Sequence, residues 1–346
     1  MAVSILEQEI HQQPEAIRAL LEMEGTNAAK IAAELEGRFK YVVIAARGTS
    51  DNAARYAQYL FGAHNQLQVA LATPSLFTLY NRPPDLSEAL VIGISQSGQS
   101  PDIVSVLAEA RRQGRPTLSI TNETASRLAM ASEYVIPLHA APERAVAATK
   151  SYTTSLAAMA LLSVLLEKNP DHLRELREIP EMMERTFLSL QDSIEHVERY
   201  RYIEHCAVLG RGYNYSTAFE VALKIKELTS VVAEPYSSAD FRHGPIATVT
   251  RGFPVILIAP RGAISEDMSE LIQRLKTRQG ELLIISDEQE LLAQADLALP
   301  VPEGLPEWLT PLVSVLPGQL FAYRLTLEKH LNPDQPEGLT KVTETR

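Results

Sequence analysis

The chain has 346 residues, of which 45% are hydrophobic, so it is long enough for two domains with full cores. Its net charge of −11 argues against broad nucleic-acid binding, although a local loop can still bind a small anion. With Cys206 as the single cysteine, no intrachain disulfide can form. The sequence contains neither a signal peptide nor an apolar run of the ~20 residues that a membrane span needs, so we expect a cytoplasmic protein that does not associate with membranes.

Residues 4–35 have apolar positions at helical spacing and predict a helical lead-in. Buried-type strands then alternate with helical segments along the rest of the chain. This alternation is typical of a parallel, doubly wound α/β sheet, which binds its ligands at the carboxyl ends of the strands. The predicted strands are 41–46, 89–94, 117–120, 134–138, 205–209, 255–259, 282–285 and 297–299, and the main predicted helices are 52–61, 101–111, 126–131, 147–166, 216–228, 264–278 and 312–331.

The loop Ser95-Gln96-Ser97-Gly98-Gln99-Ser100 follows one of these strands and precedes a helix. Its hydroxyls can each donate one hydrogen bond, and the helix N-terminus that follows favours an anion. Gly98 allows positive φ or a close approach of the ligand. The bland alternative is a serine-rich loop that only caps its helix. We favour a phosphate site, with a second polar wall supplied by Gly48-Thr49-Ser50 after the first strand.

Two landmarks recur at the same offset of 164 residues: Arg47-Gly48 as Arg211-Gly212, and the strand at Val91 as the strand at Val255. A shared offset predicts two copies of one αβα domain. The expected segments are a lead-in at 1–30, a first domain at 31–168, a helical connector at 169–200, a second domain at 201–331 and a tail at 332–346. In the second copy, residues 259–264 replace the hydroxyl cluster, so we expect one phosphate site per chain.

Three charged residues of the second half, Glu220, Lys224 and Glu227, are spaced by four and three and share one helix face. The alternative to a chemical role is a solvated salt-bridge face. His243 precedes Gly-Pro and therefore lies in a turn, where it can serve as a general acid or base or only anchor the loop. Lys341 lies in a proline-containing tail, and an unremarkable terminal lysine is its alternative reading.

Other chemistries find little support in the sequence. It has no Walker lysine motif, no dinucleotide glycine fingerprint and no cluster with zinc-ligand spacing. A hydroxyl-rich loop without Mg²⁺ ligands indicates that phosphate is held as a handle and is not transferred. We therefore expect neither a metal nor an organic cofactor in the reaction.

Several motifs together resemble the sugar isomerase (SIS) domain family, in particular the isomerase half of glutamine–fructose-6-phosphate aminotransferases. The resemblance runs in order through nearly the whole chain and implies two tandem SIS domains that bind a hexose 6-phosphate. The motifs are Gly48-Thr49-Ser50, Ser95 through Ser100, Ala148-Thr149-Lys150, Glu220 through Glu227, His243-Gly244-Pro245 and Lys341-Val342-Thr343.

The resemblance also implies roles for single residues. Ser95, Gln96, Ser97 and Ser100 would hold the phosphate, Thr49 would contact the sugar, and Glu227 would move a proton between C1 and C2 with support from Lys224 and Glu220. His243 would open the ring, reaching the site of a neighbouring subunit in a homodimer. Lys341 would form a Schiff base with the ketose. The implied substrate-contacting set is Gly48, Thr49, Ser50, Ser95, Gln96, Ser97, Gly98, Ser100, Ala148 and Thr149.

Two differences from the pattern shape the expected activity. Arg47 and Ala148 stand where the family has a small residue or cysteine and a serine, and Ala2, not a catalytic cysteine, follows Met1. We therefore expect no glutaminase activity from this chain, and the motifs then most resemble those of SIS-type glucosamine-6-phosphate deaminases. The expected reaction turns glucosamine 6-phosphate and water into fructose 6-phosphate and ammonia. A related isomerase, a fructosamine-6-phosphate deglycase and a non-catalytic sugar-phosphate sensor are the alternatives.

Overall fold

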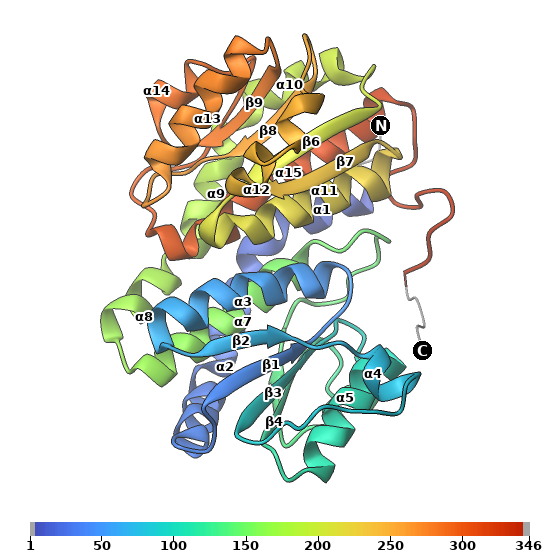
Figure 1. The fold of residues 1–346 in the computed structure, drawn as a ribbon, viewed down its shortest axis with the longest axis vertical. Helices are drawn as coiled ribbons and strands as arrows, with labels where there is room; N and C mark the ends of the chain where they lie inside the picture. The colour runs from blue at the N-terminus through green and yellow to red at the C-terminus, as the bar shows by residue number, and fades with distance from the viewer. Residues whose placement is uncertain (1–3, 342–346) are drawn as a thin grey trace. The chain divides into compact units, whose positions relative to one another are not determined.

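The computed structural model describes residues 4–341, and these form two compact units (Figure 1). The N-terminal unit comprises residues 15–143 and 150–178 together with residues 340 and 341. The C-terminal unit comprises residues 4–14, 144–149 and 179–339. Each contains one five-stranded parallel sheet flanked by helices, so the predicted α/β class with two doubly wound sheets is confirmed. No helix within residues 4–341 is long and apolar enough to cross a membrane.

The sheet of the N-terminal unit has the strand order β2-β1-β3-β4-β5. Its inner strands β3 and β4 are buried along their whole length, as expected for strands covered on both faces. The strands are β1 (Tyr41–Ala45), β2 (Gln68–Leu71), β3 (Ala89–Ile94), β4 (Thr117–Thr121) and β5 (Tyr134–Pro137), and the helices are α2 (Gln13–Leu35, whose first two residues belong to the C-terminal unit), α3 (Thr49–Asn65), α4 (Ser75–Thr78), α5 (Pro101–Arg112), α6 (Arg127–Ala131), α7 (Lys150–Glu167) and α8 (Pro170–Arg177).

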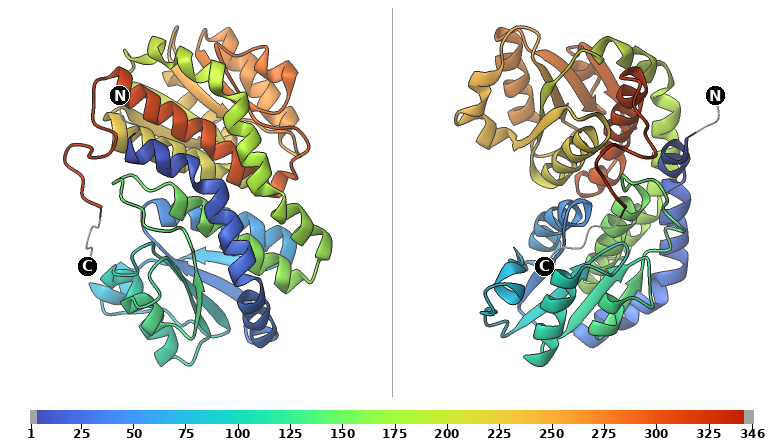
Figure 2. Two further views of the ribbon diagram at one scale, coloured as in Figure 1. Left: turned by 180° about the vertical axis from the view of Figure 1, so that it is seen from behind. Right: turned by 90° about the vertical axis from the view of Figure 1, so that its right-hand side faces the viewer.

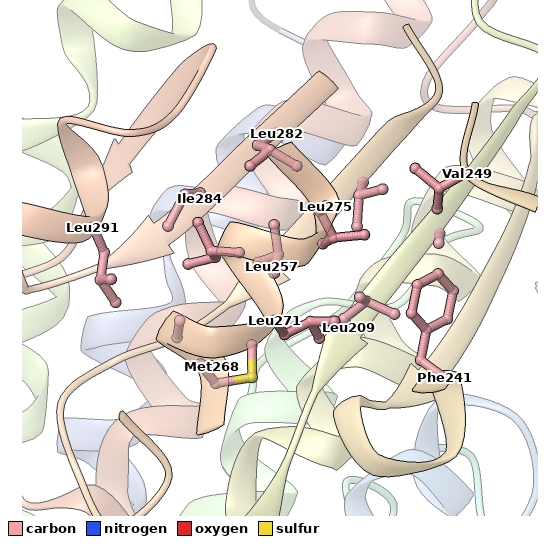
Figure 3. Packing of buried hydrophobic residues seen from close by; sticks show 14 residues of the cluster. Leu209, Phe241, Val249, Leu257, Met268, Leu271, Leu275, Leu282, Ile284 and Leu291 are labelled. Atoms are coloured by element: carbon pink, nitrogen blue, oxygen red, sulfur yellow. The ribbon is translucent and has the colours of Figure 1, made fainter. Parts of the chain in front are cut away.

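The sheet of the C-terminal unit, β7-β6-β8-β9-β10, repeats this order strand for strand. Its strands are β6 (His205–Gly210), β7 (Val232–Ser237), β8 (Pro254–Ile258), β9 (Glu281–Ser286) and β10 (Leu297–Pro300). The helices are α1 (Ile5–His11), α9 (Ile179–Ser189), α10 (Gln191–Glu195), α11 (Tyr215–Thr229), α12 (Ser238–Arg242), α13 (Ser265–Thr277), α14 (Gln289–Leu292) and α15 (Thr310–Glu328), with 3₁₀ turns η1 (His196–Tyr200), η2 (Gly212–Asn214), η3 (Pro245–Thr248) and η4 (Glu307–Leu309). Figure 3 shows Leu257, Leu275 and Phe241 within the apolar core on one face of this sheet.

In both sheets the second strand of the unit lies on one side of the first strand and the third strand lies on the other, so the strand order reverses between the first and third strands. An ion pair links the segments that follow these two strands. Arg47 Nε lies 2.7 Å from Asp102 Oδ2 in the N-terminal unit, and Arg211 Nη1 lies 2.6 Å from Asp267 Oδ1 in the C-terminal unit. Such a switch point leaves a crevice at the carboxyl ends of the strands. The predicted ligand loops at 48–50 and 95–100 both lie at this edge of the N-terminal sheet.

Two of the four edge strands, β2 and β7, were not predicted from the sequence. Each is covered less than the inner strands, and residues 68–71 alternate between exposed and half-buried positions. They therefore lack the continuous apolar run by which most inner strands are recognised.

A second correction concerns the start of α3. Thr49 and Ser50 belong to the first turn of this helix, and Gly48, with φ +53°, ends the preceding loop.

Helices α11 and α15 pack closely in the C-terminal unit, where they lie side by side (Figures 1 and 2). Their approach depends on Gly318 of α15: a Cβ at this position would lie 2.3 Å from Val221 Cγ2 and 3.1 Å from Val221 Cβ. Gly25 of α2 provides a contrast, since a Cβ there would meet no atom within 4 Å. The two helical glycines thus differ in whether an added methyl group fits.

We expect the substitutions Gly318→Ala and Gly25→Ala to change stability in opposite directions. Overpacking against Val221 should lower the free energy of unfolding by ~1 to 3 kcal/mol. The better helix propensity of alanine should raise it by roughly 0.5 to 1 kcal/mol at Gly25. Denaturant titration of both variants measures the difference, and a stabilising Gly318→Ala would contradict the close packing of α11 and α15.

Candidate active site

The serine-rich loop after β3 is organised by its own backbone. Ser95 Oγ accepts a hydrogen bond from the Gly98 N–H at 3.1 Å, and Ser97 Oγ accepts one from the Gln99 N–H at 3.4 Å. Because these oxygens act as acceptors, each hydroxyl hydrogen can still donate to a further acceptor. Ser100 occupies the N-cap of α5 without a capping hydrogen bond from its side chain, so the cap alternative is wrong for this residue. The arrangement suits an anionic oxygen acceptor.

Gly98 is needed for the shape of this loop. Its φ is +62°, and a Cβ would lie 2.1 Å from Ser126 Oγ and 2.4 Å from Ser126 Cβ. Ser126 is fully buried, where it caps α6 through a hydrogen bond from the Ala129 N–H. A side chain at position 98 would therefore displace either the loop or the start of α6.

A cavity of about 920 Å³ lies beside the loop within the N-terminal unit, and Gln96, Ser97 and Gln99 line it. Its other lining residues come from the ends of β4 and β5 and from α2. They are Ala19, Met23, Asn122, Glu123, Thr124, Pro137, His139, Ala141, Pro142 and Glu143. The volume accommodates a small phosphorylated metabolite together with water.

Lys341 is anchored within the same unit. Its Nζ lies 3.1 Å from Glu143 Oε2, and the Glu143 side chain has no exposed surface. The same carboxylate accepts hydrogen bonds from the Ser151 N–H and Ser151 Oγ at the start of α7. The reading of Lys341 as an unremarkable tail lysine is therefore wrong, because a fully buried acid holds it in place. Val342 and Thr343, which complete the predicted motif, lie outside the described residues.

The sequence analysis did not identify Glu143 as a candidate site residue. It lies in the loop after β5, and its cation is 198 residues further along the chain, so no local spacing connects the two. Ala148 and Thr149, which were predicted to contact substrate, directly precede α7; Thr149 is buried and Ala148 half-buried. In the N-terminal unit the structure thus brings together a hydroxyl loop, an amide-lined cavity and a lysine on a buried carboxylate.

The charged cluster on α11 belongs to the C-terminal unit. Lys224 Nζ lies 2.5 Å from Glu227 Oε2 and 3.4 Å from Glu220 Oε1. The side chains of Lys224 and Glu220 are 1% and 0% exposed, so the reading as a solvated salt-bridge face is wrong for these two. Glu227 is 25% exposed, which leaves this carboxylate accessible. A buried ammonium beside an accessible carboxylate is suited to holding a proton acceptor in one position.

His243 immediately follows α12 in the same unit, outside the helix, as the Gly-Pro sequence predicted. Its side chain is exposed, and among residues 4–341 its imidazole makes neither a hydrogen bond nor an ion pair. The nearby Arg242 and Arg211 both bind the Asp267 carboxylate. Burial alone would raise the pKa of Asp267, but hydrogen bonds from Ser238 and these arginines lower it. The loop is thus anchored through Arg242, and the loop-anchoring alternative for His243 is not supported.

The loop of the C-terminal unit that corresponds to 95–100 contains a carboxylate of the chain itself. Glu307 Oε2 accepts a hydrogen bond from the Ala263 N–H at 2.9 Å, and a Cβ on Gly262 would lie 2.3 Å from Glu307 Cδ. Nearby, the Arg261 N–H donates to Asp287 Oδ1. Acidic side chains therefore already occupy backbone donors of this loop, which disfavours a second phosphate there.

Comparisons with known proteins agree with this architecture. The profile of the SIS domain matches twice, at residues 39–165 and 201–329. Glutamine–fructose-6-phosphate aminotransferase [isomerizing] of Thermus thermophilus is 35% identical over 350 residues, which cover 96% of this chain and 57% of that protein. The chain thus spans little more than half the length of this relative.

Two solved structures have the same fold. One, from Silicibacter pomeroyi and named as a proposed phosphosugar isomerase, has a TM-score of 0.87 and 30% identity, covering 96% of this chain and 100% of that one. The other is a glucosamine-6-phosphate deaminase from Thermotoga maritima, with a TM-score of 0.79 and 22% identity, covering 99% of this chain and 100% of that one. At 22% identity the second comparison establishes the fold alone.

Lys224→Ala should be strongly destabilising. It removes the ammonium from beside the fully buried Glu220 carboxylate, and breaking a buried ion pair costs about 3 to 5 kcal/mol. The matched control is Lys226→Ala on the exposed face of the same helix, for which we expect a change within about 0.5 kcal/mol. Equal free energies of unfolding for the two variants would contradict the buried cluster.

Proposed function

The chain belongs to the SIS domain family, and from this premise we propose that it isomerises and deaminates a hexosamine 6-phosphate. The proposed reaction converts glucosamine 6-phosphate and water into fructose 6-phosphate and ammonia. The observation that carries the proposal is the loop 95–100, whose hydroxyl hydrogens are left to donate beside a cavity that Glu143, the anchor of Lys341, also lines. A loop that is suited to bind phosphate and the positioned amine of Lys341 thus occur in one unit.

The chemistry divides into ring opening, proton transfer and loss of ammonia. His243, in its exposed loop, would open the ring and leave a C1 aldehyde beside the C2 amine. Glu227 would then remove the C2 proton while O1 takes up a proton, which gives the enolamine. Return of the proton from Glu227 to C1, with loss of one proton from the nitrogen to balance that gained by O1, turns the enolamine into a C2 imine. Water adds to this imine and ammonia leaves, giving the ketose. Alternatively, Lys341 displaces ammonia to form a Schiff base, which water then hydrolyses.

The cluster on α11 supports the role proposed for Glu227. A general base must keep its carboxylate within hydrogen-bond reach of both carbons through the transfer. Lys224 Nζ, 2.5 Å from Glu227 Oε2, restricts the carboxylate, and Glu220 fixes the ammonium from the buried side. Exposure of the His243 side chain is compatible with its reaching a neighbouring subunit, and we propose the homodimer on the family resemblance alone.

Ammonia release from glucosamine 6-phosphate tests the reaction directly. The purified protein should produce ammonia and fructose 6-phosphate in equal amounts. Glu227→Gln should lower kcat by about 10²- to 10⁴-fold, the usual contribution of a general base. Glu234→Gln, at an exposed position of the same unit, is the control and should leave kcat unchanged.

Other outcomes of this assay identify the alternatives. Turnover of ketose and aldose 6-phosphates without ammonia would assign a simple isomerase, and release from N-substituted fructosamine 6-phosphates alone would assign a deglycase. Tight binding of fructose 6-phosphate with no turnover of any hexose phosphate would assign a sensor. Each of these results would overturn the deaminase proposal.

Ser97→Ala tests the phosphate assignment separately from the chemistry. A hydrogen bond to a charged group contributes about 1.5 to 3 kcal/mol, so KM should rise roughly 10- to 100-fold with little change in kcat. Ser105→Ala is the matched control, because the Ser105 hydroxyl donates to the Pro101 carbonyl within α5. A KM that is unchanged for Ser97→Ala would remove this hydroxyl from the phosphate site.

A further inference from the structure

Two histidines and a glutamate lie close together at the C-terminal ends of α3 and α7, away from the candidate active site. One ligand atom from each of His64, Glu167 and His172 lies within 4.8 Å of the others. His172 Nδ1 is 2.8 Å and His64 Nδ1 3.4 Å from Glu167 Oε2, and the two imidazole rings are 4.8 Å apart between centroids. We propose that these three residues bind one divalent transition-metal ion, with zinc the best match to the donor set.

The donor set and the spacing favour this class of ion. Imidazole nitrogen and carboxylate oxygen suit Zn²⁺ and its neighbours in the first transition row, and two histidines with one glutamate form a known three-ligand zinc set. Ligand atoms about 2.0 to 2.2 Å from a tetrahedral ion lie roughly 3.3 to 3.5 Å from one another. The distance from His64 Nδ1 to Glu167 Oε2 already has this value. The distance from His172 Nδ1 is shorter, and the three ligand atoms lie within 4.8 Å of one another, so the side chains must adjust around the ion.

The scaffold holds the ligands close together before any ion binds. His64 lies in the last turn of α3, and Glu167 is the last residue of α7. The neighbouring Asn65 joins the two helix ends through paired hydrogen bonds, from its Nδ2 to the Ser163 carbonyl at 2.9 Å and from Ser163 Oγ to its Oδ1 at 2.6 Å. Asn169 Oδ1 caps α8 by accepting hydrogen bonds from the Asp171 and His172 N–H groups, and Asn169 Nδ2 lies 3.1 Å from His172 Nδ1. Preorganised ligands reduce the cost of binding.

The local electrostatics also favour a cation. The carboxyl ends of α3 and α7, where helix dipoles are negative, both terminate at the cluster. Lys168, the nearest cation in sequence, is paired with Glu36 at 2.8 Å.

An adjoining cavity leaves room for a fourth ligand. It has a volume of about 610 Å³, and His64 and Glu167 are among its lining residues. Three protein ligands with one accessible position describe an exchangeable zinc centre, not a closed structural one. Since α3 spans 17 residues from Thr49, the ion would lie about 25 Å from that residue, too far to act on the sugar. The proposal therefore does not depend on the proposed reaction.

Binding of Co²⁺, followed by its visible ligand-field absorption and by calorimetry, tests the proposal on the full-length, metal-stripped protein. We expect one equivalent of Co²⁺ with four-coordinate absorption, displaced by Zn²⁺, and a Zn²⁺-dependent rise in the unfolding midpoint. Each of His64→Gln, Glu167→Gln and His172→Gln should weaken binding by at least about tenfold, since outer-shell partners alone contribute 10- to 100-fold.

His139→Gln is the matched control, because His139 also pairs with a carboxylate, Glu24 at 2.6 Å, in the same unit. This variant should keep the full affinity. The proposal is overturned if the wild-type protein binds no stoichiometric Co²⁺, or if binding survives all three ligand variants. Circular dichroism of the near-isosteric Glu167→Gln variant separates a lost ligand from a lost fold.

Discussion

The candidate site in the N-terminal unit depends on one constraint of parallel sheets. A strand covered on both faces by helices is buried along its length, so accessible polar side chains gather where the strand ends. In the N-terminal unit the ends of β3, β4 and β5 supply Ser97, Asn122 and Glu143 to one cavity. The Arg47–Asp102 pair then joins the segments on either side of the switch point. Sheet topology brings these residues together, although they are far apart in the chain.

The two units have the same topology, but their corresponding loops differ in what they can bind. Their strand orders are identical, and each has an arginine–aspartate pair across its switch point. The loops after β3 and β8 differ in what their backbone N–H groups bind. In the C-terminal unit, Glu307 already accepts from the Ala263 N–H, whereas the loop at 95–100 uses its own hydroxyl oxygens as acceptors and leaves hydroxyl hydrogens to donate. This difference disfavours phosphate binding at the loop of the C-terminal unit.

Much of the fold could be predicted because most inner strands appear in the sequence as continuous apolar runs. The edge strands β2 and β7 could not, since their partial exposure interrupts that pattern. Candidate residues within one loop or helix, such as Ser97 and Glu227, could be proposed from local sequence patterns. Glu143 and the pairing of His64 with Glu167 were not, because Lys341 is 198 residues from Glu143 and Glu167 is 103 residues from His64, and only the fold brings them together.

Calorimetric titration with fructose 6-phosphate tests the central claim, a single sugar-phosphate site formed by the loop at 95–100, most directly. The account predicts one molecule bound per chain and loss of that binding in Gly98→Ala, whose Cβ cannot fit beside Ser126. The thermal unfolding midpoint of the variant shows that the rest of the fold persists. Two bound molecules per chain, or undiminished binding by a folded Gly98→Ala variant, would contradict the account.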